Sequence, residues 1–368
     1  MSFTALDSQY MALAIQLAKK GWFTTRSNPR VGCVLVKNQQ IIGQGWHQKA
    51  GLAHAEINAI QDAIDNGHDV AGATAYVTLE PCAHQGKTPP CALALKQAKV
   101  AKVICAMLDP NPLVSGKGLD ILQQSGIATA YGLQQEQAEQ LNPGFIKRMV
   151  TGLPRVTAKV AISVDGRTAM ANGQSQWITG SAARADVQRL RAESGAVLTG
   201  SGTVIMDNPS MNVRELTFLE DKHFKQPLRV VVDSQGLVDS DAKIFEQEGM
   251  SWLVSANQSN KEYPATVINK VIAASTGKID LKALLIELAN AGVNDVLLEA
   301  GAGLNGAMLQ QGLVDQIIVY MAPKLMGNAA RGLAHLPFTD INQALALDLT
   351  DVRQLDHDIR LTFQVTSH

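Results

Sequence analysis

The sequence predicts two successive α/β domains. Its 368 residues are about twice the length of a typical domain, so two separate cores are expected. Strand-like apolar runs alternate with helical patterns in both halves, which is typical of α/β proteins. Between the halves, the segment QLNPGFIKRMVTGLP contains a cluster of structure breakers, and a fresh alternating strand follows it. We therefore predict domains over residues 1–150 and 151–368, with the boundary near residues 148–154.

Composition and charge are those of a globular enzyme. Apolar residues make up 46% of the chain and charged residues 18%, and the formal net charge is −1, which provides no long-range attraction to nucleic acid or anionic membranes. No run approaches the roughly 18 apolar residues of a membrane span. The first 21 residues carry apolar side chains at helical spacing and predict an amphipathic helix, not a signal peptide. We expect a cytoplasmic protein without a membrane partner.

The expected elements follow in order along the chain. In the first half we predict strands over Val31–Val36, Ala75–Leu79 and Val103–Met107, and helices that begin near His54 and Cys91. In the second half we predict strands over Val156–Val164, Ala196–Thr199, Leu228–Val232 and Asp295–Leu298, and helices over about Ala182–Gly195 and from about Asp280. Two cysteines, Cys33 and Cys105, lie within apolar runs and are expected to be small buried hydrophobic residues.

Four residues predict the chemistry of the first half: His54, Glu56, Cys82 and Cys91. One imidazole and two thiolates form a typical ligand set for a catalytic zinc, which keeps its fourth position open for water. Glu56 is not a ligand, and it is placed to take a proton from that water and pass it to the substrate. We predict one zinc per chain, held by the histidine and the two cysteines, with Glu56 as the catalytic proton shuttle.

Two alternatives apply to this cluster. A single buried cysteine or histidine is more often part of a core than a ligand, and His84 could replace His54. The joint pattern favours the zinc site, because HAE is followed by a strand ending in Pro-Cys and then by a second cysteine that opens a helix.

These residues resemble the cytidine-deaminase-like zinc enzymes, whose usual signature is HxE followed by PCxxC. Here eight residues separate Cys82 from Cys91, and this longer segment, PCAHQGKTPPC, is similar to the deaminases of riboflavin biosynthesis. NPRVGCVLV and HAEINAI extend the resemblance. It implies a three-layer α/β/α domain that hydrolyses an amino group from a diaminohydroxy-pyrimidinone carrying a phosphoribosylamino group. Matching positions imply that Asn28 faces this substrate and that His84, Lys87 and Thr88 hold its phosphate. The alternative for Lys87 is a solvated loop charge.

The second half resembles the reductase part of the same bifunctional enzymes, which is similar in fold to dihydrofolate reductase. The matching stretches include KVAISVDGRTA, GQSQWITG, DVQRLRAESGAVLTGSGTVIMDNPSMNVR and LLEAGAGLNGAML. The resemblance implies an NADPH-dependent reduction of the ribosyl group to a ribityl chain. It implies cofactor contacts at Ala161, Trp177, Thr203, Asp207, Ser234, Gly301, Ala302, Gly303, Leu304, Asn305, Gly306 and Ala307. It implies substrate contacts at Ser175, Arg191, Met211, Arg214 and Glu299.

Residue patterns alone support part of this second assignment. Gly301-x-Gly303-x-x-Gly306 follows a predicted strand and opens a predicted helix, which is the context of a dinucleotide fingerprint. A Rossmann domain would carry it near the domain's start with an acidic residue about 20 positions later, so we expect a different reductase fold. A structural glycine turn is the alternative. Arg191 shares its predicted helix with Arg184 and Arg189, and such a helix is often only a solvated face.

Other classes of function fit less well. An enzyme that edits nucleic acid should present a basic or aromatic surface, but aromatic residues are 5% of the chain and the charge is balanced. A non-catalytic binding protein would not require the intact set of zinc ligands and Glu56. We therefore expect a small pyrimidine ribose-phosphate substrate and no nucleic-acid partner. We also expect a homo-oligomer, either a dimer or a tetramer, although no residue pattern determines its size.

Overall fold

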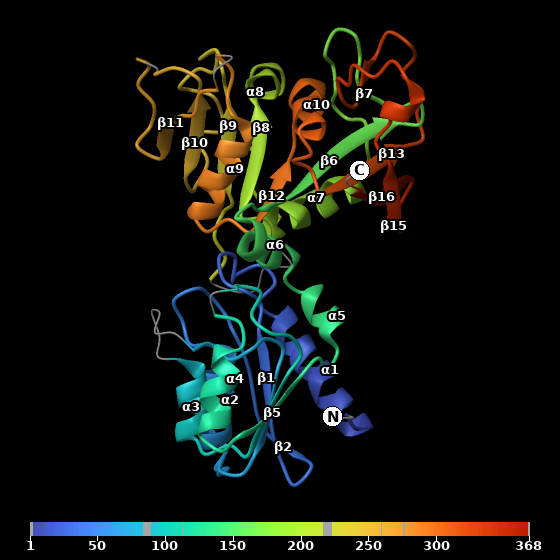
Figure 1. The fold of residues 1–368 in the computed structure, drawn as a ribbon. Helices are drawn as coiled ribbons and strands as arrows, with labels where there is room; N and C mark the ends of the chain where they lie inside the picture. Colours follow the sequence, from blue (N-terminus) through green and yellow to red (C-terminus); the bar gives the residue numbers. More distant parts are fainter. Residues whose placement is uncertain are drawn as a thin grey trace. The chain divides into compact units, whose positions relative to one another are not determined.

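The computed structural model describes residues 3–83, 90–112, 114–215, 223–258, 260–274 and 277–366. The chain divides into two compact units, Met1–Gly152 with Asp221–Phe224, and Leu153–Glu220 with Lys225–His368. Each unit contains its own β-sheet with helices packed against it (Figure 1). Within the described residues, no helix is long and apolar enough to cross a membrane.

The first unit contains a five-stranded sheet in the order β2-β1-β3-β4-β5. Its strands are β1 (Gly32–Lys37), β2 (Gln40–Trp46), β3 (Thr74–Val77), β4 (Lys102–Cys105) and β5 (Ala128–Tyr131). Its helices are α1 (Ala5–Lys19), α2 (Ala55–Asp65), α3 (Cys91–Gln97), α4 (Lys117–Gln124), α5 (Gln135–Glu139) and α6 (Pro143–Thr151). Strand β1 is antiparallel to β2 and β3, whereas β3, β4 and β5 are parallel.

Helices cover both faces of this sheet. One core joins the sheet to α2, α3 and α4, and the other joins it to α1 and α5. Helix α1 begins with a capping box, in which Thr4 and Asp7 each satisfy the other's backbone N–H. The three-layer α/β/α arrangement predicted for the first domain is confirmed.

The second unit contains a nine-stranded sheet in the order β11-β10-β9-β8-β12-β6-β13-β16-β15. The strands are β6 (Arg155–Ser163), β8 (Ala196–Gly200), β9 (Leu228–Val232), β10 (Ser251–Ser255), β11 (Val267–Val271), β12 (Asp295–Leu298), β13 (Gln316–Ala322), β15 (Leu347–Leu355) and β16 (Asp358–Val365). A separate pair is formed by β7 (Arg167–Ala169) and β14 (Arg331–Gly332). The helices are α7 (Ser181–Glu193), α8 (Ser201–Asp207), α9 (Leu281–Asn290), α10 (Ala302–Gln310) and the short 3-10 helix η1 (Ile341–Gln343).

Seven neighbouring strands of this sheet are parallel, namely β11, β10, β9, β8, β12, β6 and β13. The hairpin of β16 and β15 is added to β13 in the antiparallel direction. Along β6, Val156, Ala158 and Val160 are buried in the core that also contains α9 and α10. Because side chains alternate along a strand, Lys159 and Ala161 lie on the opposite face. That face and the carboxyl ends of β8, β9 and β12 carry most of the reductase residues predicted from the sequence.

Most predicted elements occur where the sequence places them, with small errors at the ends. The strands predicted over Ala75–Leu79 and Val103–Met107 end at Val77 and Cys105. Leu79 and Met107 nevertheless remain buried, so the apolar pattern continues beyond the regular strand. The sequence does not predict the strands β2, β5, β7, β10, β11, β13, β14, β15 and β16.

Candidate active sites

Three predicted zinc ligands converge from three different elements. His54 caps the N-terminus of α2, Cys82 follows β3, and Cys91 is the first residue of α3. Their ligand atoms all lie within 4.8 Å of one another. The Nδ1 atom of His54 lies 3.2 Å from the Cys91 sulfur and 3.6 Å from the Cys82 sulfur.

This donor set fits a tetrahedral zinc. Zinc bonds of about 2.1 Å to nitrogen and 2.3 Å to sulfur place neighbouring donors roughly 3.5–3.8 Å apart, close to the observed spacing. The Cys91 backbone N–H donates to the Cys82 sulfur at 3.2 Å. Hydrogen bonding with Cys91 and His54 lowers the pKa of the Cys82 thiol to about 4, which favours the thiolate that binds metal.

Glu56 lies beside these donors without joining them. It is the second residue of α2, and its side chain is buried, with 3% of its surface exposed. Burial, reinforced by the negative charge of Cys82, raises the pKa of Glu56 to about 7. A carboxyl group with a pKa near neutrality can both accept and release a proton.

A second histidine, which sequence reasoning missed, connects Asn28 to the zinc ligands. The Asn28 side-chain amide lies 3.0 Å from Nε2 of His47, and Nδ1 of His47 lies 3.1 Å from the Ala53 carbonyl oxygen. The His47 ring packs edge-on against the His54 ring, with centroids 5.2 Å apart. The structure thus brings Asn28 toward the metal centre. His47 has no motif of its own, so only its neighbours in space reveal it.

The predicted phosphate ligands His84, Lys87 and Thr88 lie outside the described residues. The structure describes the chain on both sides of them, at Cys82 and at Cys91.

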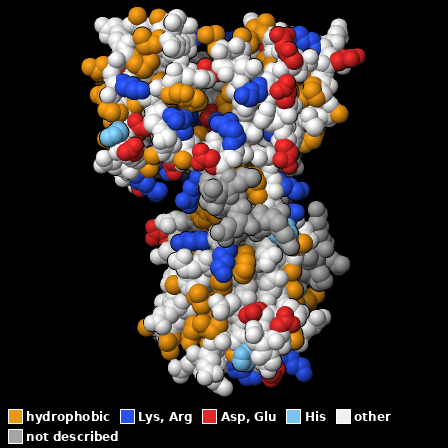
Figure 2. All heavy atoms as spheres, turned by 180° about the vertical axis from the view of Figure 1, so that it is seen from behind, with side chains coloured by type: hydrophobic (Ala, Val, Ile, Leu, Met, Phe, Trp, Pro, Cys, Tyr) orange, Lys and Arg blue, Asp and Glu red, His pale blue; other side chains and the backbone are white. Residues whose placement is uncertain are grey.

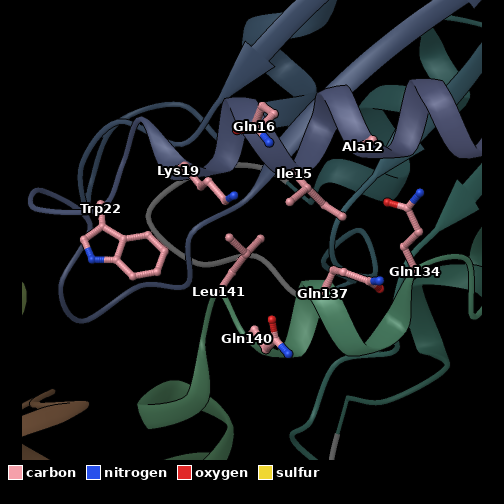
Figure 3. Close-up of a pocket in the computed structure, with 9 residues that line it drawn as sticks. All are labelled: Ala12, Ile15, Gln16, Lys19, Trp22, Gln134, Gln137, Gln140 and Leu141. Carbon is pink, nitrogen blue, oxygen red and sulfur yellow. The ribbon is translucent and has the colours of Figure 1, made fainter. Parts of the chain in front are cut away.

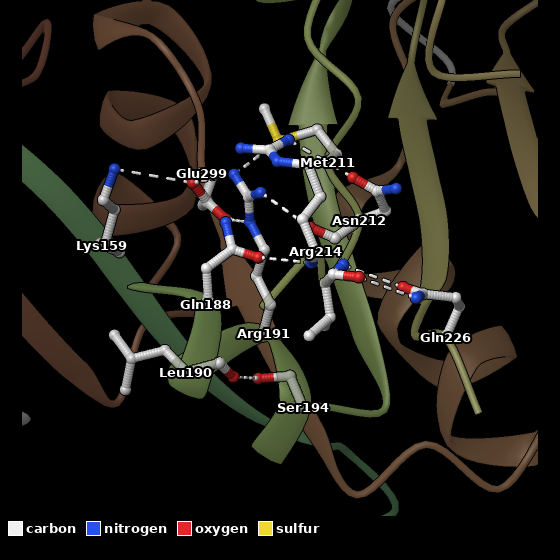
Figure 4. A network of polar contacts seen from close by, with 11 residues as sticks. Lys159, Gln188, Leu190, Arg191, Ser194, Met211, Asn212, Arg214, Gln226 and Glu299 are labelled. Atoms are coloured by element: carbon white, nitrogen blue, oxygen red, sulfur yellow. Dashed lines mark hydrogen bonds and ion pairs between the residues drawn. The ribbon is translucent and has the colours of Figure 1, made fainter. Parts of the chain in front are cut away.

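In the second unit, the carboxylate of Glu299 lies at the end of β12 and contacts two cations (Figure 4). It accepts hydrogen bonds from Nε and Nη2 of Arg191 at 2.5 and 3.0 Å, and Nζ of Lys159 lies 3.5 Å away. Burial alone would raise the pKa of Glu299, but Arg191 and Lys159 lower it to about 2. Arg191 is 8% exposed, so its interpretation as part of a solvated helix face is wrong.

The other predicted substrate residues gather around this pair. Arg191 also donates to the Asn212 carbonyl oxygen and contacts the Met211 sulfur at 3.6 Å. The backbone N–H of Arg214 donates to the Gln188 side chain, and burial together with the nearby Arg191 lowers the pKa of Arg214. Figure 4 shows the Arg191 and Arg214 side chains close together. Neither Gln188 nor Asn212 was predicted, because their roles depend on contacts between α7 and the segment after α8.

Predicted cofactor residues meet where β8 and β12 end. These parallel neighbours continue into α8 and α10, which carry Thr203 and the glycine-rich segment Gly301–Ala307. A side chain at Gly301 would lie 3.8 Å from the Thr203 hydroxyl, and one at Gly200 would lie 3.5 Å from Leu304. In α/β sheets, ligands bind in such a crevice at the carboxyl ends of the strands.

The three glycines of the motif differ in their surroundings. A Cβ atom at Gly303 would meet nothing within 4 Å, so its backbone is open to a ligand. A Cβ atom at Gly306 would overlap the backbone carbonyl oxygen of His335. Gly306 therefore permits close packing of α10 against that segment. Asn305 packs beside it, donating to the Ala300 and Leu333 carbonyl oxygens.

The remaining predicted reductase residues are more dispersed. The Ser175 hydroxyl donates to the Asp207 carboxylate at 2.9 Å, so a predicted substrate residue and a predicted cofactor residue touch. Ser234 lies in the turn that follows β9, and Ala161 lies on β6. Trp177 is 63% exposed and stacks with the Arg184 guanidinium, whose carbon lies 4.7 Å from the ring centroid.

A separate cavity of about 330 Å³ lies between α1 and α5 (Figure 3). Four glutamines, Lys19 and Trp22 contribute to its lining, together with three apolar side chains. None of the predicted site residues lines it, so it is distinct from both candidate sites.

Known families and structures resemble the whole chain. Residues 4–107 match the cytidine and deoxycytidylate deaminase zinc-binding region, and residues 154–361 match the RibD C-terminal domain. The riboflavin biosynthesis protein RibD of Escherichia coli is 48% identical over 363 residues, covering 96% of this chain and 98% of that protein. RibD of Haemophilus influenzae is 47% identical and covers 99% of this chain and 98% of its own length.

Two solved structures share the fold over both units. Acinetobacter baumannii RibD (form 1) has a TM-score of 0.90 and 48% identity, covering 98% of this chain and 99% of that one. A Thermotoga maritima protein has a TM-score of 0.88 and 31% identity with the same coverage. That protein is named a diaminohydroxyphosphoribosylaminopyrimidine deaminase/5-amino-6-(5-phosphoribosylamino)uracil reductase.

The fold and the two sites define a bifunctional enzyme, in which a zinc-binding deaminase domain precedes an NADPH-dependent reductase domain. The chain belongs to the RibD family of riboflavin biosynthesis proteins. The fold class and the two activities predicted from the sequence are confirmed by this membership.

Proposed function

We propose that the first unit deaminates a diaminohydroxy-pyrimidinone that carries a phosphoribosylamino group, and that the second unit reduces the ribosyl group of the product. The observation that supports this most directly is the cluster of His54, Cys82 and Cys91 with Glu56 buried beside it. The substrate follows from the name of the Thermotoga maritima relative and from the family to which the chain belongs. We assign deamination to residues 1–150 and reduction to residues 151–368.

In the deaminase site, His54, Cys82 and Cys91 would hold the zinc. When bound, the metal supplies a Lewis acid that makes water acidic near neutral pH. Glu56 takes the proton of the attacking water and transfers it to the pyrimidine, so that the ring amino group leaves as ammonia and a carbonyl oxygen remains. The Asn28 amide lies 3.0 Å from Nε2 of His47 and is proposed to face the ring. His84, Lys87 and Thr88 are proposed to hold the phosphate, since they offer two cationic donors and a hydroxyl.

In the reductase site, bound NADPH would supply the hydride for C1′ of the ribosyl group, while the ring oxygen that leaves C1′ would take up a proton. The backbone at Gly301 and Gly303 would accept the pyrophosphate, and the Thr203 hydroxyl lies near Gly301. Ala161, Trp177, Asp207 and Ser234 are proposed to contact the rest of the cofactor, together with the remaining residues of the Gly301–Ala307 segment.

The substrate of the second step carries a phosphate, and the observed charges suit an anion. Lys159, Arg191 and Arg214 place three cationic groups around the single carboxylate of Glu299. We propose that Arg214, the exposed member of this group, binds the phosphate with a planar fork of donors. Arg191 is largely occupied by Glu299 and Asn212, so we propose that it mainly orients Glu299 and Met211 toward the substrate, beside Ser175.

Metal analysis and product detection test the first step. Purified protein should contain about one zinc per chain and should release ammonia from the diaminopyrimidine phosphate. A zinc-loaded protein that releases none from this substrate would overturn the assignment.

We further propose that the protein is a cytoplasmic homo-oligomer, either a dimer or a tetramer. Strand β15 is the edge of its sheet, and its Leu349 and Val352 side chains are 55% and 57% exposed. Exposed apolar side chains on an edge strand favour association. Light scattering should give a multiple of the chain mass, and Val352→Asp should reduce it if this edge takes part.

A nucleic-acid substrate is not supported. On the face drawn in Figure 2, acidic and basic side chains are intermixed and do not form one basic field. Deamination of single-stranded oligonucleotides, assayed beside the pyrimidine phosphate, distinguishes the two.

A further inference from the structure

A second buried carboxylate lies two residues before the zinc ligand Cys82. Glu80 is 4% exposed. Its carboxylate accepts hydrogen bonds from four backbone N–H groups of the segment after β4. One oxygen accepts from Asp109 and Gly116 at 3.0 and 2.9 Å. The other accepts from Gly118 and Leu119 at 2.8 and 3.4 Å. Because a carboxylate has acceptors only, both oxygens match this set of donors.

The segment after β4 also contacts the backbone next to Cys82. Pro81 links Glu80 to Cys82, and a Cβ atom at Gly118 would overlap the Pro81 carbonyl oxygen. The backbone N–H of Glu80 donates to the Met107 carbonyl oxygen at 2.9 Å. The start of α4 and the end of β4 therefore fix the chain from which Cys82 projects.

The other side of Cys82 is held by α3. The Cys91 backbone N–H donates to the Cys82 sulfur, and the Ala92 backbone N–H donates to the Cys82 carbonyl oxygen at 3.2 Å. Cys82 is not part of a helix or strand that would itself orient the thiolate. Its position depends on two anchors, α3 on one side and Glu80 on the other.

We propose that Glu80 is a positioning residue for the zinc centre, acting through Pro81 to set the placement of the Cys82 thiolate. This inference rests on the proposed zinc site. Groups that orient ligands typically change metal affinity about 10- to 100-fold when they are removed. We expect a loss of that size for Glu80, although its carboxylate touches neither metal nor substrate.

Glu80→Gln tests the role of the carboxylate most directly. The amide keeps the size of the side chain but places an NH₂ group against two N–H donors. Gly118→Ala is the second variant, because its Cβ atom would overlap the Pro81 carbonyl oxygen and approach the Glu80 carboxylate to 3.2 Å, while the carboxyl group itself is retained. Tyr76→Phe is the matched control. Tyr76 lies on β3, the strand that leads to Glu80, and its hydroxyl donates to Asp7 at 2.6 Å. Its replacement therefore removes a hydrogen bond to a carboxylate in helix α1.

The experiment measures zinc affinity by competition with a chelator, and the visible spectrum of the cobalt-substituted full-length protein. Thermal unfolding of each variant is recorded in parallel. We expect Glu80→Gln and Gly118→Ala to weaken zinc binding about 10- to 100-fold and to shift the cobalt bands. Tyr76→Phe should lower the melting temperature and leave both metal readouts at wild-type values.

The outcomes separate this inference from the proposed function. If the wild-type protein binds no zinc at these residues, the proposed function fails. If it binds zinc and the two variants keep wild-type affinity and cobalt spectra, Glu80 is merely structural and the inference is overturned. If Glu80→Gln does not fold, the result for Gly118→Ala decides.

Discussion

The guanidinium of Arg191 donates two hydrogen bonds to the carboxylate of Glu299, and both groups are buried at the carboxyl edge of the reductase sheet. The pair joins helix α7 to the end of strand β12, and its two residues are 108 positions apart in the sequence. A buried ion pair depends on its geometry, because either charge left alone in the interior is costly.

Removing Arg191 should therefore destabilise the second unit strongly. Arg191→Met retains the length of the aliphatic part and leaves Glu299 with Lys159 as its cation. Loss of one member of a buried pair typically costs about 3–5 kcal/mol, and urea unfolding should show a change of that order. Arg189→Ala is the control on the same helix, since its pair with Glu193 is more exposed and should contribute below about 1 kcal/mol. Equal effects for the two variants would contradict this assignment.

The Arg191–Glu299 pair also predicts that the free energy of unfolding decreases at acid pH. The pKa of Glu299 is about 2 in the folded protein and near 4.5 when unfolded, so its contribution to stability is complete above about pH 5. It is lost as the pH falls toward 2, because the unfolded chain takes up the proton first. The wild-type protein should lose more stability between pH 5 and pH 3 than Glu299→Gln, measured as free energies of unfolding. Parallel curves for the two proteins would show that Glu299 is not responsible.

The glycines of the Gly301–Ala307 segment should respond differently to alanine. Gly303→Ala has space for its methyl group and lies within α10, so the fold should be unaffected or stabilised by up to about 1 kcal/mol. NADPH binding should nevertheless weaken if the pyrophosphate lies against this backbone. Gly306→Ala should destabilise the unit, because its methyl group collides with the His335 backbone. Calorimetry with NADPH and thermal unfolding measure the two effects, and wild-type NADPH affinity for Gly303→Ala would argue against a phosphate site there.

Glu56→Gln should separate metal binding from catalysis. The amide cannot take a proton from water, so ammonia release should fall at least about 10²- to 10⁴-fold, while the zinc content stays near one per chain. The reductase rate on the deaminated product serves as the control within the same chain. Deamination at the wild-type rate would rule out Glu56 as the proton shuttle.

The sequence was most informative where chemistry is encoded locally. The ligands His54, Cys82 and Cys91 were identified because zinc coordination restricts residue type, and HxE and PC motifs keep each ligand beside a recognisable strand or helix. Strands with continuous apolar runs, such as β8 and β12, were predicted for the same reason: burial on both faces leaves a local pattern.

The features that were missed depend on contacts distant in sequence. His47 and Gln188 have no distinguishing motif, and their roles arise from partners 19 and 26 positions away. Strand β15 was not predicted because most of its side chains are exposed, so it carries little of the apolar pattern of a buried strand. Arg191 was given two interpretations, and only its burial against Glu299 distinguishes them.

We propose that one chain performs deamination and then reduction, and coupled assays on the diaminopyrimidine phosphate test this order most directly. Ammonia release and NADPH oxidation are followed side by side for the wild-type protein and for Glu56→Gln. We predict that ammonia release precedes NADPH oxidation in the wild type, and that the variant oxidises NADPH only when given the deaminated product. Oxidation of NADPH by Glu56→Gln at the wild-type rate on the diaminopyrimidine itself would contradict the proposed order of the two reactions.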